Sequence, residues 1–259
     1  MSAPCRAVAL LVVPLLFSGC FGTQRKSFDY GPYVASDPRS VVVAPIAGAG
    51  PAEQARLLSW ITRPLAERGY YVMPVRMTQE LAAQEGFTAY ERETKTWLDM
   101  DTKFSGSTVV ENPEDTAAIA EMAVEWAAYF GADAVLFGQI VDWGHRENYS
   151  EGYFANMIDA KKDHAVGLDY LLVDDRGQTI WRAEKWIVHT RGGGGVFKEI
   201  WNAATKPEDV DIDAGLAFEA NWWLITGERL RTPDRWYSYS DPVLVGPYHP
   251  DYEADRARR

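Results

Sequence analysis

Cysteine is almost absent from this chain of 259 residues, since only Cys5 and Cys20 occur. Both lie within the first twenty residues, so the rest of the chain contains no thiol. An internal disulfide, a catalytic cysteine and a cysteine-rich zinc site are therefore excluded from that part. The fold must depend on its apolar core, for which 47% hydrophobic residues and ten tryptophans provide enough material.

The chain also lacks an apolar run of the roughly 20 residues that a membrane-spanning helix needs. The apolar run at residues 7–17 is shorter, follows a single basic residue, Arg6, and leads into Ser18-Gly19-Cys20. This layout is that of a secretory signal peptide. Its ending resembles the signal of a bacterial lipoprotein, which predicts a signal at residues 1–19 and a lipidated, palmitate-carrying Cys20 at the start of the mature protein. The alternative is an ordinary secretory signal that happens to end in cysteine.

Positive charge is scarce. The whole chain has 26 basic and 37 acidic residues. Removal of the signal would also remove one of the basic residues, Arg6. Such a chain repels nucleic-acid phosphates and anionic lipid headgroups, so neither is an expected partner. Any attachment to outer-membrane lipids must therefore come from the acyl chains on Cys20. We expect residues 20–37 to form the lipidated cysteine and a short tether.

Motifs that would indicate catalysis or metal binding are missing. There is no G-x-S-x-G nucleophile motif, and the carboxylates are too numerous to pair by spacing alone. The histidines show no HExxH or paired spacing, although a zinc site made from residues distant in sequence is left open. The sequence therefore predicts no catalytic residue, no cofactor and no metal ligand; the four histidines are His145, His164, His189 and His249.

Two stretches resemble ligand-binding loops but depart from their patterns. Gly48-x-Gly50 lacks the third small residue of a dinucleotide-binding fingerprint, because Glu53 occupies that place. The alternating aspartates of residues 209–213 lack the glycine and the final glutamate of a calcium loop. These aspartates are better explained as acidic residues at the start of a helix, where they complement the helix dipole.

The hydrophobic pattern predicts alternating strands and helices in one domain, residues 38–231. Residues 40–44 read as a strand buried on both faces, and Pro74 favours an edge position for residues 70–75. Residues 166–172 alternate as in a half-buried strand that pairs with residues 179–189. Helices are expected at 52–68, 79–85 (capped by Thr78), 113–130 and 211–230, with a further central strand at 133–141. This order predicts an α/β (α+β) sandwich, a mixed β-sheet with helices packed on it.

Two segments fall outside this pattern. Residues 91–111 are polar and poorly periodic, and we interpret them as an insertion that leaves the core. Residues 232–259 form a tail rich in proline and aromatic residues, which we expect on the surface. Exposed tyrosine and tryptophan are favoured in interfaces, whereas the alternative is that they pack the tail onto the domain. These residues are Trp236, Tyr237, Tyr239, Tyr248 and Tyr252, while Trp222-Trp223 is expected in the core.

Several segments resemble a family of bacterial outer-membrane lipoproteins of unknown function. They are residues 28–30 (FDY), 37–40 (DPRS), 62–75 (TRPLAERGYYVMPV), 131–136 (GADAVL) and 246–250 (GPYHP). The resemblance runs from the signal peptide almost to the carboxyl end. It implies a fold similar to the amino-terminal domain of TolB and to periplasmic parts of the curli-secretion lipoprotein CsgG. It implies no catalytic residues.

Together these observations favour a non-enzymatic, lipid-anchored protein that faces the periplasm from the outer membrane. Phe21, rather than aspartate, after the cysteine favours outer-membrane export by the usual sorting rule. Its expected role is as an interaction or assembly component of an outer-membrane complex, with a CsgG-like lipoprotein as a candidate partner. The alternative is a periplasmic domain that binds a ligand or acts on cell-wall glycan.

Overall fold

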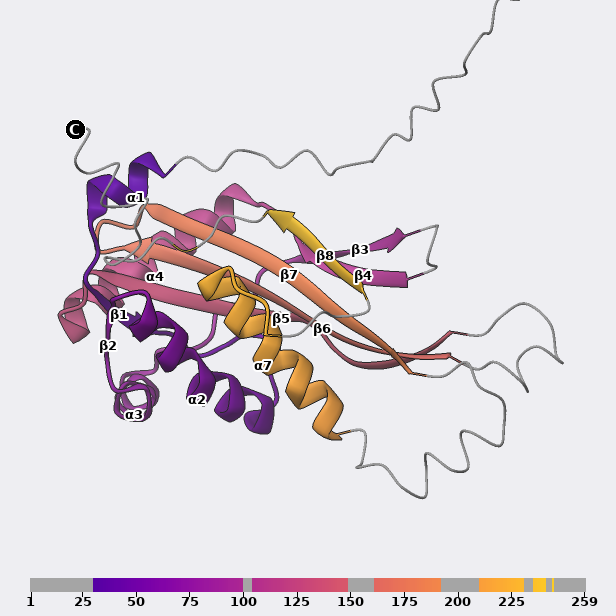
Figure 1. Cartoon of the computed structure of the whole chain (residues 1–259). Coiled ribbons are helices and arrows are strands. Elements are labelled where there is room, and N and C mark those ends of the chain that lie inside the picture. The colour runs from indigo at the N-terminus through magenta and orange to yellow at the C-terminus, as the bar shows by residue number, and fades with distance from the viewer. Residues whose placement is uncertain are drawn as a thin grey trace, which may run out of the picture.

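A computed structural model describes residues 30–99, 104–148, 161–191, 210–230, 235–240 and 244. A six-stranded sheet forms its centre, in the order β2-β1-β5-β6-β7-β8 (Figure 1). The strand β1 is parallel to β2 and β5, and the remaining pairs are antiparallel, so the predicted mixed sheet is confirmed. The strands are β1 Ser40–Val43, β2 Tyr71–Val72, β5 Ala134–Asn148, β6 Lys161–Asp174, β7 Thr179–Arg191 and β8 Arg235–Ser240.

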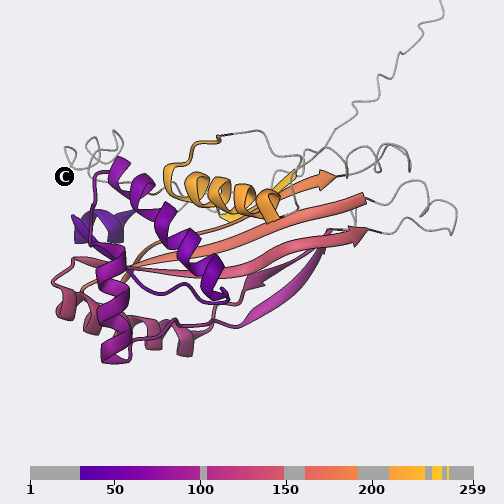
Figure 2. The same cartoon turned by 90° about the horizontal axis from the view of Figure 1, so that it is seen from below.

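Helices cover both faces of this sheet. Figure 2 shows α2 and α7 on one face, and α4 with a small hairpin, β3–β4, on the other. Each face has its own apolar cluster, and β1 contributes alternate residues to both, as a strand buried on two faces must. The helices are α1 Gly31–Ser36, α2 Pro51–Glu67, α3 Val75–Glu85, α4 Pro113–Phe130 and α7 Val210–Thr226.

Burial of β6 is more complete than its sequence pattern indicated. The expectation of a half-buried strand was wrong, because residues 163–174 are all buried. Val166 and Leu168 pack under α2 and α7, while Leu171 and Val173 pack under α4 on the opposite face. The polar residues that produced the alternation are thus also covered. Some of them form the site described below.

Helix ends follow local chemistry, with one correction. Asn112 caps α4, and its Oδ1 accepts a hydrogen bond of 2.9 Å from the Glu114 amide. Gly131 ends α4 with a φ of 67°, a conformation that glycine adopts without strain. Thr78 is not a cap: α3 begins at Val75, and the Thr78 hydroxyl donates to the Val75 carbonyl inside the first turn.

The two segments expected outside the core have defined structures. Within residues 91–111, β3 (Thr94–Asp99) and β4 (Phe104–Val109) form an antiparallel hairpin. Residues 235–240 of the predicted surface tail form β8, the last strand of the main sheet. Their alternation of aromatic residues and serine suits an edge strand. In the part of the chain that the structure describes, no helix has the length and hydrophobicity to cross a membrane.

Candidate functional site

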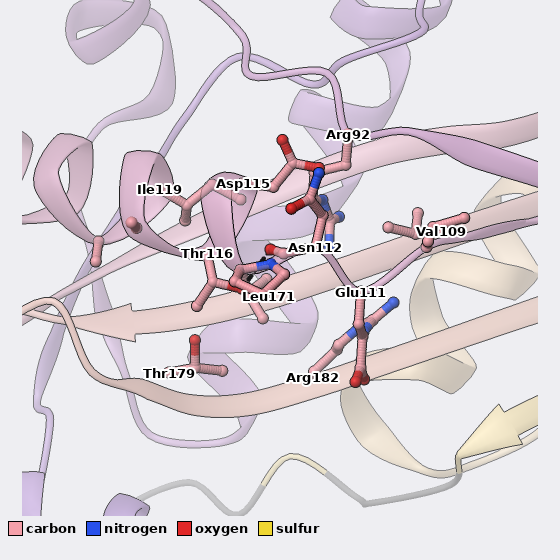
Figure 3. A pocket seen from close by; sticks show the side chains of 14 residues that line it. Arg92, Val109, Glu111, Asn112, Asp115, Thr116, Ile119, Leu171, Thr179 and Arg182 are labelled. Atoms are coloured by element: carbon pink, nitrogen blue, oxygen red, sulfur yellow. Dashed lines mark hydrogen bonds and ion pairs between the residues drawn. The ribbon is translucent and has the colours of Figure 1, made fainter.

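A pocket of about 620 Å³ opens where the amino end of α4 approaches β6 and β7 (Figure 3). Its wall combines the loop before β3, the loop after β4 and the first two turns of α4. The floor is apolar, with Ile119 and Leu171. The polar residues that line it are Arg92, Glu111, Asn112, Asp115, Thr116, Thr179 and Arg182.

Asp169 holds the two arginines of the pocket in place. The Asp169 side chain is fully buried, and its two oxygens accept hydrogen bonds from different guanidinium groups. Arg92 donates from Nη2 to Oδ1, and Arg182 donates from Nε to Oδ2 at 3.1 Å. Arg182 also donates to Glu111 at 2.9 Å. A buried carboxylate that bridges two cations fixes both in one geometry.

Gln139 fixes the backbone of Arg92. Its Oε1 accepts from the Arg92 amide at 3.0 Å, and its Nε2 donates to the Arg92 carbonyl at 2.9 Å. Gln139, Asp169 and Glu184 lie opposite one another on β5, β6 and β7. This polar row lies on the sheet face that α4 and the hairpin cover. Through this row, the segment that leads into β3 is hydrogen-bonded to the central strands of the sheet.

Glu184 ends this row beneath the hairpin. Its Oε2 accepts from the Thr108 hydroxyl at 2.8 Å, and its Oε1 accepts from the Val109 amide at 3.0 Å. Burial, together with the neighbouring Asp169 carboxylate, raises the pKa of Glu184 to about 7. Arg182 and the two hydrogen bonds oppose this increase. Near neutral pH a fraction of the protein therefore carries a protonated Glu184.

This pKa predicts a pH dependence of stability. The folded-state pKa lies above the unfolded value of 4.5, so Glu184 contributes stability below pH 4.5 that is lost as pH rises towards 7. Urea unfolding from pH 5 to pH 8 should show the wild type losing stability relative to Glu184→Gln. We expect a relative loss of about 1–3 kcal/mol. Parallel pH profiles for the two proteins would contradict the raised pKa.

The arginine side chains of the pocket are paired with carboxylates. The two guanidinium charges are offset by Asp169 and Glu111, so no surplus positive charge remains to attract an anion. No group of three histidine, cysteine, aspartate or glutamate side chains is placed to hold a metal ion among the described residues. Sequence reasoning missed this site. The signal it could have used was the presence of Asp169 and Glu184 among the apolar residues of β6 and β7.

A second candidate site lies on the surface where α7 and β8 meet. The Arg229 guanidinium lies between two indoles, 4.3 Å from the centroid of Trp223 and 4.2 Å from that of Trp236. The Lys185 ammonium lies 3.7 Å from the Trp223 ring centroid. Trp236 is 41% exposed, and Leu230 is 48% exposed. We call Trp223, Arg229, Leu230 and Trp236 the Trp236 surface.

The aromatic residues chosen from the sequence divide between core and surface. Trp222 and Trp223 are buried, as predicted. Trp236 is exposed, as an interface residue would be. The side chains of Tyr237 and Tyr239 lie outside the described part, as do Tyr248 and Tyr252. Cys20 and the signal peptide also lie outside it, so lipid attachment at Cys20 stays a prediction.

Comparison with known proteins tests the resemblance. The model of the family described as "Putative lipoprotein GNA1162-like" matches residues 28–110. A putative lipoprotein of Neisseria meningitidis serogroup B is 32% identical over 136 residues, which is 52% of this chain and 52% of that protein. The predicted resemblance to a lipoprotein family is confirmed. The chain spans about half the length of this relative.

Solved structures give more distant matches. The crystal structure of lipoprotein GNA1162 from Neisseria meningitidis is 22% identical, with a TM-score of 0.38, over 64% of this chain and 95% of that one. A PelC dodecamer from Paraburkholderia phytofirmans is 16% identical, with a TM-score of 0.30, over 72% of this chain and 87% of that one. The α/β sandwich described above rests on the strand order of this chain itself.

Proposed function

We propose that this chain is a non-enzymatic lipoprotein that is anchored to the outer membrane through Cys20, faces the periplasm and binds a partner protein there. The observation that carries the partner-binding part is the Trp236 surface. The anchoring part rests on the Ser18-Gly19-Cys20 ending and on the lipoprotein family match. A component of an envelope assembly, such as a CsgG-like lipoprotein, is the kind of partner the resemblance suggests.

The composition of the Trp236 surface is that of a binding hot spot. Tryptophan and arginine are the residues whose truncation most often weakens protein complexes. The guanidinium of Arg229 lies over both indoles in the unbound chain, so these side chains are ordered before a partner arrives. Ordering them in advance lowers the entropic cost of binding. The exposed side chains of Trp236 and Leu230 also supply apolar area that a partner can bury.

The charge of the domain makes the anchor depend on lipid. With an excess of acidic residues, the folded part gains nothing from anionic headgroups. Acyl chains contribute about 0.8 kcal/mol for each buried CH₂ group, so lipidated Cys20 must supply the membrane affinity. The predicted tether of residues 20–37 is too long, because α1 begins at Gly31 and Tyr33 is buried in the core. The shorter segment between Cys20 and α1 then connects the lipid to the domain.

The partner-binding proposal predicts a loss of partner on truncation of one side chain. In pull-downs from detergent-solubilised envelopes, Trp236→Ala should reduce recovery of the partner at least tenfold, the size of a hot-spot effect. The matched control is Tyr71→Ala, since Tyr71 is 62% exposed on β2 at the other edge of the sheet. It should leave recovery unchanged. Repeated recovery of no partner by the wild type, or equal recovery by both variants, would contradict the proposal.

The pocket beside α4 favours a second candidate function, a periplasmic domain that binds a ligand or acts on cell-wall glycan. Its volume of about 620 Å³ is within the range of small-molecule sites. Isothermal titration with cell-wall disaccharide fragments tests this function directly. Binding that is lost when the lining residue Thr179 is replaced by tryptophan would support it, whereas no heat of binding would exclude these ligands.

A further inference from the structure

One cation of the Trp236 surface has no acidic partner. Arg229 is exposed, and its guanidinium lies over the rings of both Trp223 and Trp236. Within the residues that the structure describes, this guanidinium forms no hydrogen bond and no ion pair. Most of the other described arginines are paired with an aspartate or a glutamate. These are Arg39, Arg63, Arg76, Arg92, Arg176 and Arg182.

The contacts with the two indoles leave the hydrogen-bond donors of Arg229 unused. A guanidinium is planar, and its five N–H groups form a rigid fork in that plane. The attraction between its charge and the face of an aromatic ring does not require these N–H groups as donors. Contact with two rings also restricts the side chain before a ligand arrives, which lowers the cost of binding. Arg229 is therefore an ordered donor fork without an acceptor.

A carboxylate is the acceptor that fits this fork, because its two oxygens can accept two parallel N–H bonds. The neighbouring Glu228 does not fill this role. Burial lowers the pKa of Arg68, and the Glu228 charge opposes that decrease, so Glu228 acts on Arg68. The exposed side chains of Leu230 and Trp236 favour a ligand that has apolar groups near its carboxylate.

Charge favours a protein segment over a lipid as the source of this carboxylate or of another anionic group. The chain has 37 acidic and 26 basic residues, so an anionic membrane surface repels it as a whole, and one exposed arginine does not reverse that balance. An acidic segment of a partner is repelled by most of the chain and attracted at Arg229. Such a contrast fixes the position at which the segment binds.

We propose that Arg229 binds an aspartate or glutamate side chain of the partner protein, and that Trp236 and Leu230 contact the apolar residues that flank it. This inference rests on the partner-binding function proposed above and names the chemistry of the segment that is bound. The ligand class is an acidic peptide segment with apolar neighbours.

Peptide arrays test the inference. The purified full chain in detergent is applied to immobilised heptapeptides, capped at both ends, that have a central glutamate and random apolar flanking residues. The same peptides with a central glutamine form the second set. The wild type should bind the glutamate set about 10- to 100-fold more strongly, the size of a charge-assisted hydrogen bond. Arg229→Gln should bind both sets alike, whereas Arg229→Lys should keep part of the preference, since lysine keeps the charge without the fork.

Arg76→Gln is the matched control, because the Arg76 side chain is 93% exposed on α3 and its variant should keep the full preference. The two peptide sets separate recognition of a carboxylate from a structural role. If Arg229 only orders the indoles, the wild type binds both sets alike and Arg229→Gln weakens both by the same factor. Equal binding of the wild type to both sets, binding to neither, or a glutamate preference that Arg229→Gln keeps would overturn the proposal. Circular dichroism confirms that each variant is folded, and Arg229→Lys is compared in place of any Arg229→Gln protein that is not.

The pull-down with Trp236→Ala tests partner binding separately. A partner lost from Trp236→Ala, together with no glutamate preference on the arrays, would contradict the carboxylate and leave partner binding intact. An Arg229-dependent glutamate preference without any partner from envelopes would support the carboxylate site and contradict partner binding. Phosphatidylglycerol vesicles test the lipid source. Binding of Cys20→Ser to these vesicles that is lost when Arg229→Gln is added would overturn the assignment to a protein segment.

Discussion

Replacement of Asp169 by alanine is expected to lower the free energy of unfolding by about 3–5 kcal/mol. Asp169 is fully buried and bridges Arg92 and Arg182, and the Arg92 side chain is itself only 6% exposed. Its removal would leave a buried guanidinium with no compensating carboxylate. Domains of this kind have about 5–15 kcal/mol of stability in total. The variant should therefore be partly unfolded at physiological temperature.

Urea unfolding followed by circular dichroism measures this loss. The matched control is Asp175→Ala in the neighbouring turn, where the Asp175 side chain is 59% exposed and lies 3.8 Å from Arg176. Exposed pairs contribute about 0–1 kcal/mol, so this variant should be close to the wild type. Equal losses in the two variants would show that Asp169 does not hold the pocket together.

Replacement of Cys20 by serine is expected to move the protein from the membrane fraction to the soluble fraction. Serine has no thiol to carry the lipid, and the acidic chain has no affinity for anionic headgroups to replace it. The effect should be close to complete. Membrane fractionation with immunoblotting measures it, and metabolic labelling with palmitate should show label in the wild type and none in Cys20→Ser.

Cys5→Ser is the matched control for this experiment. Cys5 lies inside the predicted signal peptide and should leave with it, so this variant should stay in the membrane fraction and keep the label. A soluble Cys20→Ser protein with an unchanged circular dichroism spectrum would show that the anchor is not needed for folding. Continued membrane retention of Cys20→Ser would refute the anchor.

Local chemistry could be predicted from the sequence wherever one short segment determines the outcome. Asn112 and Gly131 mark the ends of α4 because capping and left-handed backbone depend on a few neighbouring residues. The run of valines in β1 indicated burial on both faces for the same reason. Thr78 was assigned wrongly because Pro74, just before the first turn, lets the helix begin earlier.

The sites depended on long-range pairing, which a single sequence does not show. Asp169 lies in the strand that was predicted to be half-buried, but Asp169 and Glu184 are both covered, and Arg92 forms an ion pair with Asp169. The polar row of Gln139, Asp169 and Glu184 depends on the register of three strands. Trp236 could be named as an interface candidate, yet its contact with Arg229 arises from the pairing of β8 with β7.

Site-specific photo-crosslinking in intact cells tests the partner-binding claim most directly. A photoreactive residue in place of Leu230, which is 48% exposed beside Arg229, leaves Trp236 intact. The matched position is Leu98, which is 56% exposed on β3. The proposal predicts one recurrent protein adduct from position 230, identified by mass spectrometry, and none from position 98. No adduct from position 230, or the same adducts from both positions, would contradict it.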